Sequence, residues 1–321
     1  MLEHGRVCIN HTQELALNGI MWFDDKNRRY YNLNAEQWVD AKNEISQKYP
    51  KPKPIDFSEV AKIANILADD FDAGERQAEV WYCSVVNTND NDMKLIARTV
   101  LDLIQKSRKT SAVKMKEPLF CSFLVESIVT PFLCLNEDCL TLLGNTDESL
   151  GSKMRREQDG RRPDLSVLAE FNNQSAMPFM CEVKSSQFMN NLKQTDDKHP
   201  DFIKLCNLMK DELDRMTVLK EKVVYGLLVE GFKCQLFAMD NDYYKLYRLS
   251  MLNQFYLPRD LYDFSSLEPC FKRLGQLKML MQTTATAILD AFYESDPEES
   301  IWSPNRKPNI NTLVSFRSPQ K

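Results

Sequence analysis

Two carboxylates and a lysine stand at matching ends of two apolar stretches in the segment RRPDLSVLAEFNNQSAMPFMCEVKSS, residues 161–186. Asp164 opens the first stretch, and Glu182 and Lys184 close the second. The polar cluster between them, Asn172–Ser175, is typical of a turn, so we expect a β-hairpin. If the turn is centred in this cluster, Asp164 faces Glu182, with Cβ atoms about 4.5–5.5 Å apart.

Strand geometry then decides which side chains meet. Alternate residues of a strand share a face, so Glu182 and Lys184 point the same way and Val183 points into apolar packing behind them. Two carboxylates this close raise each other's pKa, and a divalent cation or an ammonium group relieves the repulsion. Mg²⁺ prefers such oxygen ligands, polarises a phosphodiester and lowers the pKa of bound water. Lys184 would orient that water or stabilise charge in the transition state. The alternative interpretation is an exposed strand with a solvated charged face.

The Pro-Asp dipeptide ending at Asp164, followed by Glu182-Val183-Lys184, resembles the PD-(D/E)XK nuclease superfamily, the restriction-endonuclease-like enzymes. The resemblance covers about residues 118–240. It implies that Asp164, Glu182 and the carbonyl of Val183 hold Mg²⁺ or Mn²⁺, and that Lys184 assists the attacking water. It also implies a nucleic-acid substrate, which we expect to be DNA. The Gln-and-Tyr element of the RecB-like branch is not evident after Lys184, so that branch is not assigned.

A further acidic residue, Glu126, lies in a helix expected over residues 118–133. The superfamily's helix before the sheet often supplies an acidic group, and Glu126 matches that role by order. A carboxylate in a core-facing stripe is costly unless it is paired or bound to metal. Alternatively, Glu126 lies at the stripe's edge and reaches water, since Pro131 is expected to kink the helix. The expected apolar stripe is Leu119, Phe123, Val129 and Leu133.

A basic run, KMRREQDGRR, ends just before the motif. We expect its cations to border the metal site and contact phosphates. A solvated loop and a nuclear localisation signal are the alternatives. The net charge of −5 argues against a high-affinity, non-specific nucleic-acid binder. The five basic residues are Lys153, Arg155, Arg156, Arg161 and Arg162.

The order of apolar patterns predicts an α/β fold, a restriction-endonuclease-like core with a mixed central β-sheet flanked by helices, over residues 111–295. Besides the hairpin, strands are expected at residues 138–143, 223–229, 233–239 and 243–249, with a turn at residues 240–242. An amphipathic helix is expected at residues 202–219 and a closing helix or helix pair at residues 265–293. We expect a solvated face on the first of these helices, formed by Lys204, Lys210 and Arg215.

The ends of the chain are expected to differ from this core. The sequence of residues 1–110 predicts a mainly helical region, either accessory or binding a protein partner, with a hairpin at residues 22–31. Helices are expected at residues 58–71 and 91–106, with Ser58 and Asp92 as N-caps. Residues 296–321 are rich in Pro, Ser, Asn and basic residues, and predict a poorly ordered tail.

The amino-acid composition indicates the cellular compartment in which we expect the protein. The 321 residues contain 9 Cys and 3 His with no C-x-x-C pair, which argues against structural zinc and for a reducing interior, nucleus or cytoplasm. No apolar run reaches the length of a membrane span, and no secretory signal is evident, so no membrane partner is expected. Two alternatives to a nuclease stay open. One is a catalytically silent nuclease-fold protein that binds nucleic acid or a protein partner, and the other is an unrelated α/β protein with an accidental motif.

Overall fold

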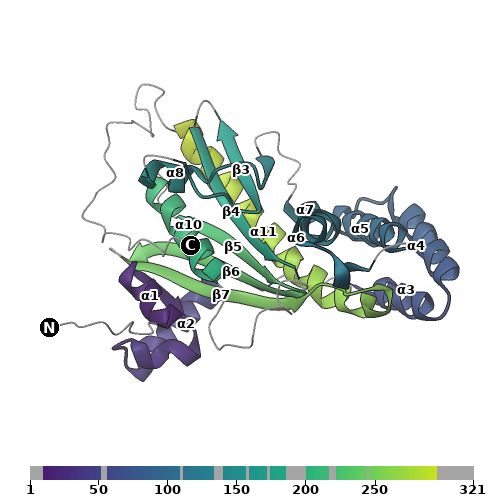
Figure 1. Cartoon of the computed structure of the whole chain (residues 1–321), viewed down its shortest axis with the longest axis horizontal. Helices are drawn as coiled ribbons and strands as arrows, with labels where there is room; N and C mark the ends of the chain where they lie inside the picture. The colour runs from purple at the N-terminus through teal and green to yellow at the C-terminus, as the bar shows by residue number, and fades with distance from the viewer. Residues whose placement is uncertain are drawn as a thin grey trace.

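The protein is an α/β structure built on a seven-stranded mixed sheet flanked by helices (Figure 1). The sheet order is β1-β7-β6-β5-β4-β3-β2. The coarse prediction of a mixed sheet covered by helices is confirmed. The computed structural model describes residues 10–51, 56–108, 111–133, 140–156, 159–171, 174–185, 200–216, 222–243 and 246–294.

The predicted hairpin forms, and its register is the predicted one at the end next to Asp164 and Glu182. Leu165 pairs with Cys181, and continuing this register by one residue puts Asp164 opposite Glu182. One irregularity interrupts the pairing, between Val167 and Ala169. Residues 172–173, where the turn was expected, lie outside the described residues. The antiparallel strands are β2 (Leu140–Gly144), β3 (Leu165–Phe171) and β4 (Gln174–Lys184).

A helical crossover follows the hairpin. Helix α10 (Pro200–Arg215) joins β4 to β5 (Val223–Glu230), and the two strands are parallel. Strands β6 (Lys233–Tyr243) and β7 (Leu246–Tyr256) continue the sheet antiparallel. The turn predicted at residues 240–242 is wrong, because β6 runs on to Tyr243.

Two apolar cores, one on each face of the sheet, place the motif residues. Met180 and Leu228 pack with α10 in one core. Cys181 and Val183 pack in the other, which also contains residues of α11 (Leu267–Glu294), a single helix. Figure 1 shows α10 and α11 covering the sheet from opposite sides. Val183 therefore points into the α11 core, as predicted.

The helix expected at residues 118–133 is broken by a π-helical turn, η3 (Cys121–Val125), between α6 (Glu117–Phe120) and α7 (Glu126–Leu133). A π turn adds a residue and rotates the apolar face. Leu119, ahead of this turn, is 52 % exposed, so its place in the predicted stripe is wrong, whereas Phe123 packs against the core as expected. Val129 and Leu133 in the second half are buried as expected.

The N-terminal residues supply one edge of the sheet. Strand β1 (Ile20–Phe23) pairs parallel with β7, and the hairpin expected at residues 22–31 is wrong, since the short helix η1 (Asp25–Tyr30) follows β1. Leu15, Ile20 and Trp22 share the apolar core that contains α10. The helices of this part are α1 (His11–Leu17), α2 (Ala35–Lys48), α3 (Ser58–Asp69), α4 (Phe71–Val85) and α5 (Asn91–Ser107).

Helix α5 begins with a side-chain cap that differs from the expected one. Asp90, rather than Asp92, accepts a hydrogen bond from the backbone N of Met93. Ser58 is the first residue of α3 and not its cap. Of the remaining elements, η2 (Ala112–Lys114) precedes α6, α8 (Leu150–Arg156) precedes β3, and η4 (Leu261–Ser266) precedes α11. No helix within the described ranges is long and apolar enough to cross a membrane.

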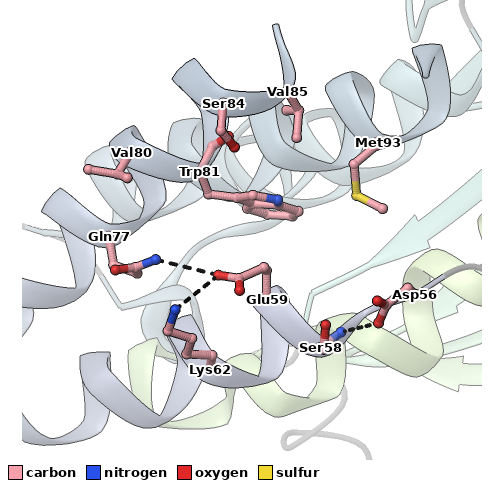
Figure 2. A pocket seen from close by; sticks show the side chains of 10 residues that line it. All are labelled: Asp56, Ser58, Glu59, Lys62, Gln77, Val80, Trp81, Ser84, Val85 and Met93. Atoms are coloured by element: carbon pink, nitrogen blue, oxygen red, sulfur yellow. Dashed lines mark hydrogen bonds and ion pairs between the residues drawn. The ribbon is translucent and has the colours of Figure 1, made fainter. Parts of the chain in front are cut away.

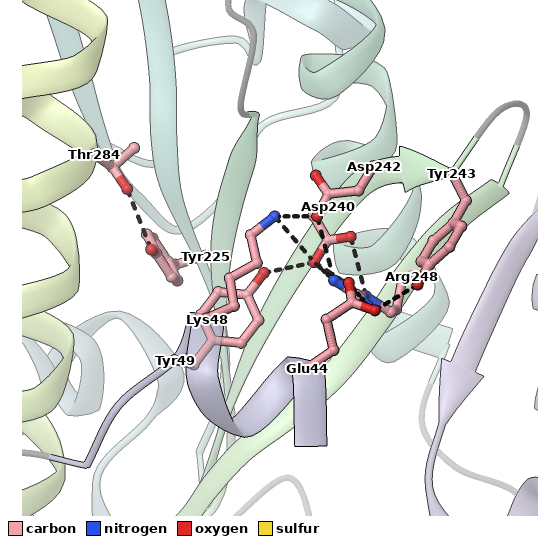
Figure 3. A network of polar contacts seen from close by, with 9 residues as sticks. All are labelled: Glu44, Lys48, Tyr49, Tyr225, Asp240, Asp242, Tyr243, Arg248 and Thr284. Atoms are coloured by element: carbon pink, nitrogen blue, oxygen red, sulfur yellow. Dashed lines mark hydrogen bonds and ion pairs between the residues drawn. The ribbon is translucent and has the colours of Figure 1, made fainter. Parts of the chain in front are cut away.

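A largely buried network of ion pairs links α2 to the sheet (Figure 3). Arg248 of β7 pairs with Asp240 of β6 at 3.1 Å and with Glu44 of α2 at 2.7 Å. Tyr49, which caps α2, donates its hydroxyl to Asp240 Oδ2 at 2.7 Å. Asp240 thus stays inside the sheet, where the sequence alone had favoured a turn, because Arg248 and Tyr49 satisfy its buried carboxylate.

Candidate functional site

The Asp164 carboxylate is fixed on the end of β4. Its Oδ2 accepts a hydrogen bond from the backbone N of Val183 at 2.6 Å, and its own backbone N donates to the Cys181 carbonyl at 2.9 Å. Burial raises the pKa of Asp164, and the Val183 N–H and the nearby Lys184 oppose that rise. Asp164 therefore touches the chain between the two other motif side chains.

The Glu182 carboxylate is the most deeply buried group of the motif, at 1 % exposure. Its Oε2 accepts from Lys204 Nζ at 2.7 Å. Within the described part of the chain, Oε1 has no hydrogen-bond partner. Burial raises the pKa of Glu182 to about 8; Lys204 opposes this rise and Asp164 adds to it.

The Lys184 ammonium lies between two carboxylates that come from different helices. Its Nζ is 2.9 Å from Glu117 Oε1 of α6 and 3.2 Å from Asp201 Oδ2 of α10. Burial alone would lower the pKa of Lys184, but the hydrogen bond to Glu117 and the charge of Asp201 outweigh it and hold the pKa above its ordinary value. Lys184 is therefore a positive charge, not a neutral amine, at physiological pH.

Glu126 lies at the border of this cluster. Its Oε1 accepts a long hydrogen bond of 3.8 Å from Cys121 Sγ. Burial raises the pKa of the Cys121 thiol to about 12, and the charges of Glu126, Asp164 and Glu117 add to the rise. The charges of these three carboxylates thus act on one thiol, and Glu126 stays a candidate residue of the site.

Three charged residues of the cluster were not predicted as site residues: Glu117, Asp201 and Lys204. The expectation of a solvated face on α10 is wrong, because Lys204 pairs with Glu182 and both Lys210 and Arg215 are buried. One signal was present in the sequence. A buried acid at position 182 needs a counter-charge, and Lys204 stands on the first turns of the next helix.

The basic run before the motif folds partly as helix α8, not as a loop. Gly151 lets α8 approach α10 closely, since a Cβ there would lie 2.5 Å from the backbone carbonyl of Asp211. Arg155 Nε pairs with the buried Asp211 carboxylate at 2.6 Å. Arg155 is therefore a structural residue in part, which weakens its predicted role as a free phosphate contact.

The other cations of the run lie nearer the surface. Lys153 and Arg162 both pair with Glu148, at 3.2 and 3.5 Å. Arg161 is half-buried, and burial lowers its pKa, with the charges of Arg156 and Arg155 adding to the effect. The run adjoins the acidic cluster, because Lys204 Nζ also donates to the Arg162 carbonyl at 2.8 Å.

The donors at the end of β4 fit a hard divalent cation. Asp164 and Glu182 carry oxygen donors of the kind Mg²⁺ and Mn²⁺ prefer, and the Val183 carbonyl directly follows Glu182 in the chain. The unpartnered Glu182 Oε1 is a buried acceptor for which a cation would be a partner. No group of three or more His, Cys, Asp or Glu side chains that could hold a metal occurs among the residues the structure describes. A metal here would need the backbone oxygen as well.

Comparison of the chain with family models, curated proteins and solved structures gave no match. Any function must therefore be inferred from these contacts.

A hollow of about 410 Å³ lies among α3, α4 and α5 (Figure 2). Trp81 and Met93 form part of its lining, and Glu59 accepts hydrogen bonds across it from Lys62 and Gln77. None of its lining residues belongs to the β4 cluster. Protein binding by the N-terminal region stays a prediction.

Proposed function

We propose that the protein is a metal-dependent nuclease, with a restriction-endonuclease-like core, that hydrolyses phosphodiester bonds of nucleic acid, DNA in the first instance. One observation carries the proposal. Asp164 Oδ2 lies 2.6 Å from the Val183 backbone N, so Asp164 meets the strand segment that carries Glu182 and Lys184. Two consecutive strands thus bring together the residues on which the superfamily resemblance rests.

The order of elements supports the same proposal. Helix α7 precedes the antiparallel strands β2, β3 and β4, and α10 then leads to β5 parallel with β4. Apart from α8 between β2 and β3, this is the helix–strand–hairpin–helix–strand order that the resemblance implies. The motif lies at the end of β4 from which the chain leaves for α10, and α6, α10 and the segment before β3 contact this end.

In the proposed mechanism Asp164, Glu182 and the carbonyl of Val183 hold the cation. When bound, the cation polarises the phosphodiester and lowers the pKa of water. Glu117 and Asp201 keep Lys184 charged, so Lys184 serves as a fixed positive donor and not as a general base. Its ammonium stabilises negative charge that develops on the phosphate.

The direct test is a cleavage assay of the purified protein on duplex DNA, single-stranded DNA and RNA with Mg²⁺ or Mn²⁺. We expect cleavage of DNA that stops on chelation. If none of the substrates is cut with either metal, the nuclease proposal is wrong.

A catalytically silent nuclease fold is the second candidate, and one contact favours it. The Lys204–Glu182 pair at 2.7 Å compensates the buried carboxylate without a metal. Such a protein would bind nucleic acid in the same assays, would cut none, and would show no change of thermal stability with Mg²⁺.

Replacing Lys184 by Ala should preserve metal binding and lower the cleavage rate roughly 10²–10³-fold, the usual cost of removing one transition-state donor. Calorimetric Mn²⁺ titration and single-turnover cleavage should be measured together. Lys278→Ala is the control, since Lys278 of α11 forms an ion pair with Asp92 of α5, outside the site. A Lys184→Ala protein that cuts at the wild-type rate would remove Lys184 from the mechanism.

Replacing Arg156 and Arg162 together by Ala should weaken DNA binding equally for all sequences. The salt dependence should flatten by about 2 in slope, because each lost phosphate contact releases about one counterion fewer. Both side chains are exposed, so the fold should tolerate the change. Binding is titrated at several salt concentrations in an Asp164→Asn background, which prevents cleavage.

The matched control for that experiment replaces Arg76 and Arg98, exposed residues of α4 and α5, by Ala. It removes the same charge from a region outside the basic run. An equal loss of binding in the control would show that only net charge matters. An unchanged salt slope in Arg156→Ala/Arg162→Ala would leave the run as a solvated surface.

A further inference from the structure

One ammonium group links three separate segments of the site. Lys204 Nζ is 2.7 Å from Glu182 Oε2 on β4 and 2.8 Å from the Arg162 carbonyl, two residues before Asp164. Lys204 itself belongs to the beginning of α10. The ion pair therefore holds helix, strand and the segment before β3 together.

Glu182 needs this partner in the absence of a metal. Its side chain is almost completely buried, and an uncompensated carboxylate in such a place is costly. Oε2 receives the Lys204 ammonium, whereas Oε1 has no partner within the described residues. Lys204 thus supplies the positive charge that a metal would otherwise supply.

A metal ion ligated by Glu182 would be repelled by the Lys204 ammonium in its present position. Mg²⁺ lies about 2.1 Å from a ligand oxygen. A cation on Oε1, the oxygen that Lys204 does not contact, would lie within about 7 Å of the Lys204 ammonium, where like charges repel each other away from bulk water. Lys204 can move away from Glu182, since its side chain is 26 % exposed and its flexible stem can extend toward solvent.

We propose that Lys204 is an internal counter-ion that closes the metal-free site and leaves Glu182 when a divalent cation binds. The inference rests on the proposed function and concerns the regulation of that same site. Leaving Glu182 also releases the Arg162 carbonyl, so metal loading loosens the segment that carries the basic run. The freed ammonium then lies beside the place where a phosphate would bind.

The test measures the reactivity of Lys204 in the wild-type protein, so it does not depend on the folding of a variant. Brief acylation with and without saturating Mn²⁺ is followed by mass spectrometry of each lysine. Lys204 should become at least about tenfold more reactive with Mn²⁺, the factor that corresponds to losing one charge-assisted hydrogen bond. Lys278 is the internal control, because it forms a 2.6 Å pair with Asp92 and its side chain is 18 % exposed.

The same labelling in Asp164→Asn, which lacks a proposed ligand, should show no effect of Mn²⁺ on Lys204. A calorimetric Mn²⁺ titration of each protein separates the outcomes. Metal binding with unchanged or lower Lys204 reactivity overturns the counter-ion and leaves the nuclease proposal standing. An equal rise at Lys278 also overturns it. Absence of metal binding by the wild-type protein overturns the proposed function and this inference with it.

Discussion

Asp164→Asn and Glu182→Gln are each expected to abolish metal-dependent cleavage and the stabilisation of the protein by Mg²⁺. Both carboxylates are proposed ligands, and the amides remove their charge with little change of shape. A ligand that binds only the folded state stabilises it by about 2.7 kcal/mol at 100 times its Kd. Thermal unfolding with and without Mg²⁺ should therefore show a shift for the wild-type protein and none for either variant.

The contacts of the two residues make the variants suitable for this test. In Asp164→Asn the side-chain oxygen can still accept from the Val183 N–H, and in Glu182→Gln it can still accept from Lys204. Asp159→Asn is the matched control, because Asp159 is an exposed acid five residues before Asp164. Equal Mg²⁺ shifts in all four proteins would contradict a metal site at the end of β4.

The core of this site could be predicted from the sequence because its signals are local. Two apolar stretches around a polar cluster define a hairpin, and period-two alternation then sets which side chains share a face. This reasoning put Asp164 opposite Glu182 and Val183 in the apolar core, as the structure has them. The pairing of these two strands does not depend on distant residues, since the strands follow one another in the chain.

The partners of these residues could not be predicted in the same way. Glu117 and Asp201 reach Lys184 from helices on either side of it in the chain, and only the packed structure brings them together. The π-helical turn at Cys121–Val125 shifts the helical phase after α6, so Leu119 is exposed while Val129 and Leu133 beyond the turn are buried as expected. A helical period assumed to be constant fails wherever a residue is inserted.

The edge of the sheet was missed for a related reason. Ile20–Phe23 is four residues long, too short for a clear strand pattern, and its partner β7 is more than two hundred residues away. Arg248 and Asp240 likewise form an ion pair across two strands that the sequence had separated by a turn. Pairing between distant segments produces no fixed residue spacing by which a single sequence would reveal it.

That ion-pair network supports the second large prediction: Arg248→Met should destabilise the protein by about 3–5 kcal/mol, because it leaves buried Asp240 without its main counter-charge. Arg248 is only 2 % exposed and also pairs with Glu44 and Asp242. Figure 3 shows these groups converging from α2, β6 and β7. Lys48 contacts Asp240 at 3.6 Å and would compensate only part of the loss.

Urea unfolding measures this cost, and Arg98→Met is its control. Arg98 forms an exposed pair with Asp102 one turn along α5, and such pairs contribute about 0.3–0.5 kcal/mol. Arg248→Met should lower the unfolding midpoint strongly while Arg98→Met leaves it nearly unchanged. Equal small effects would mean that Lys48 and Tyr49 alone satisfy Asp240. A large effect would show that the guanidinium shared by α2 and the sheet makes a major contribution to the stability of the fold.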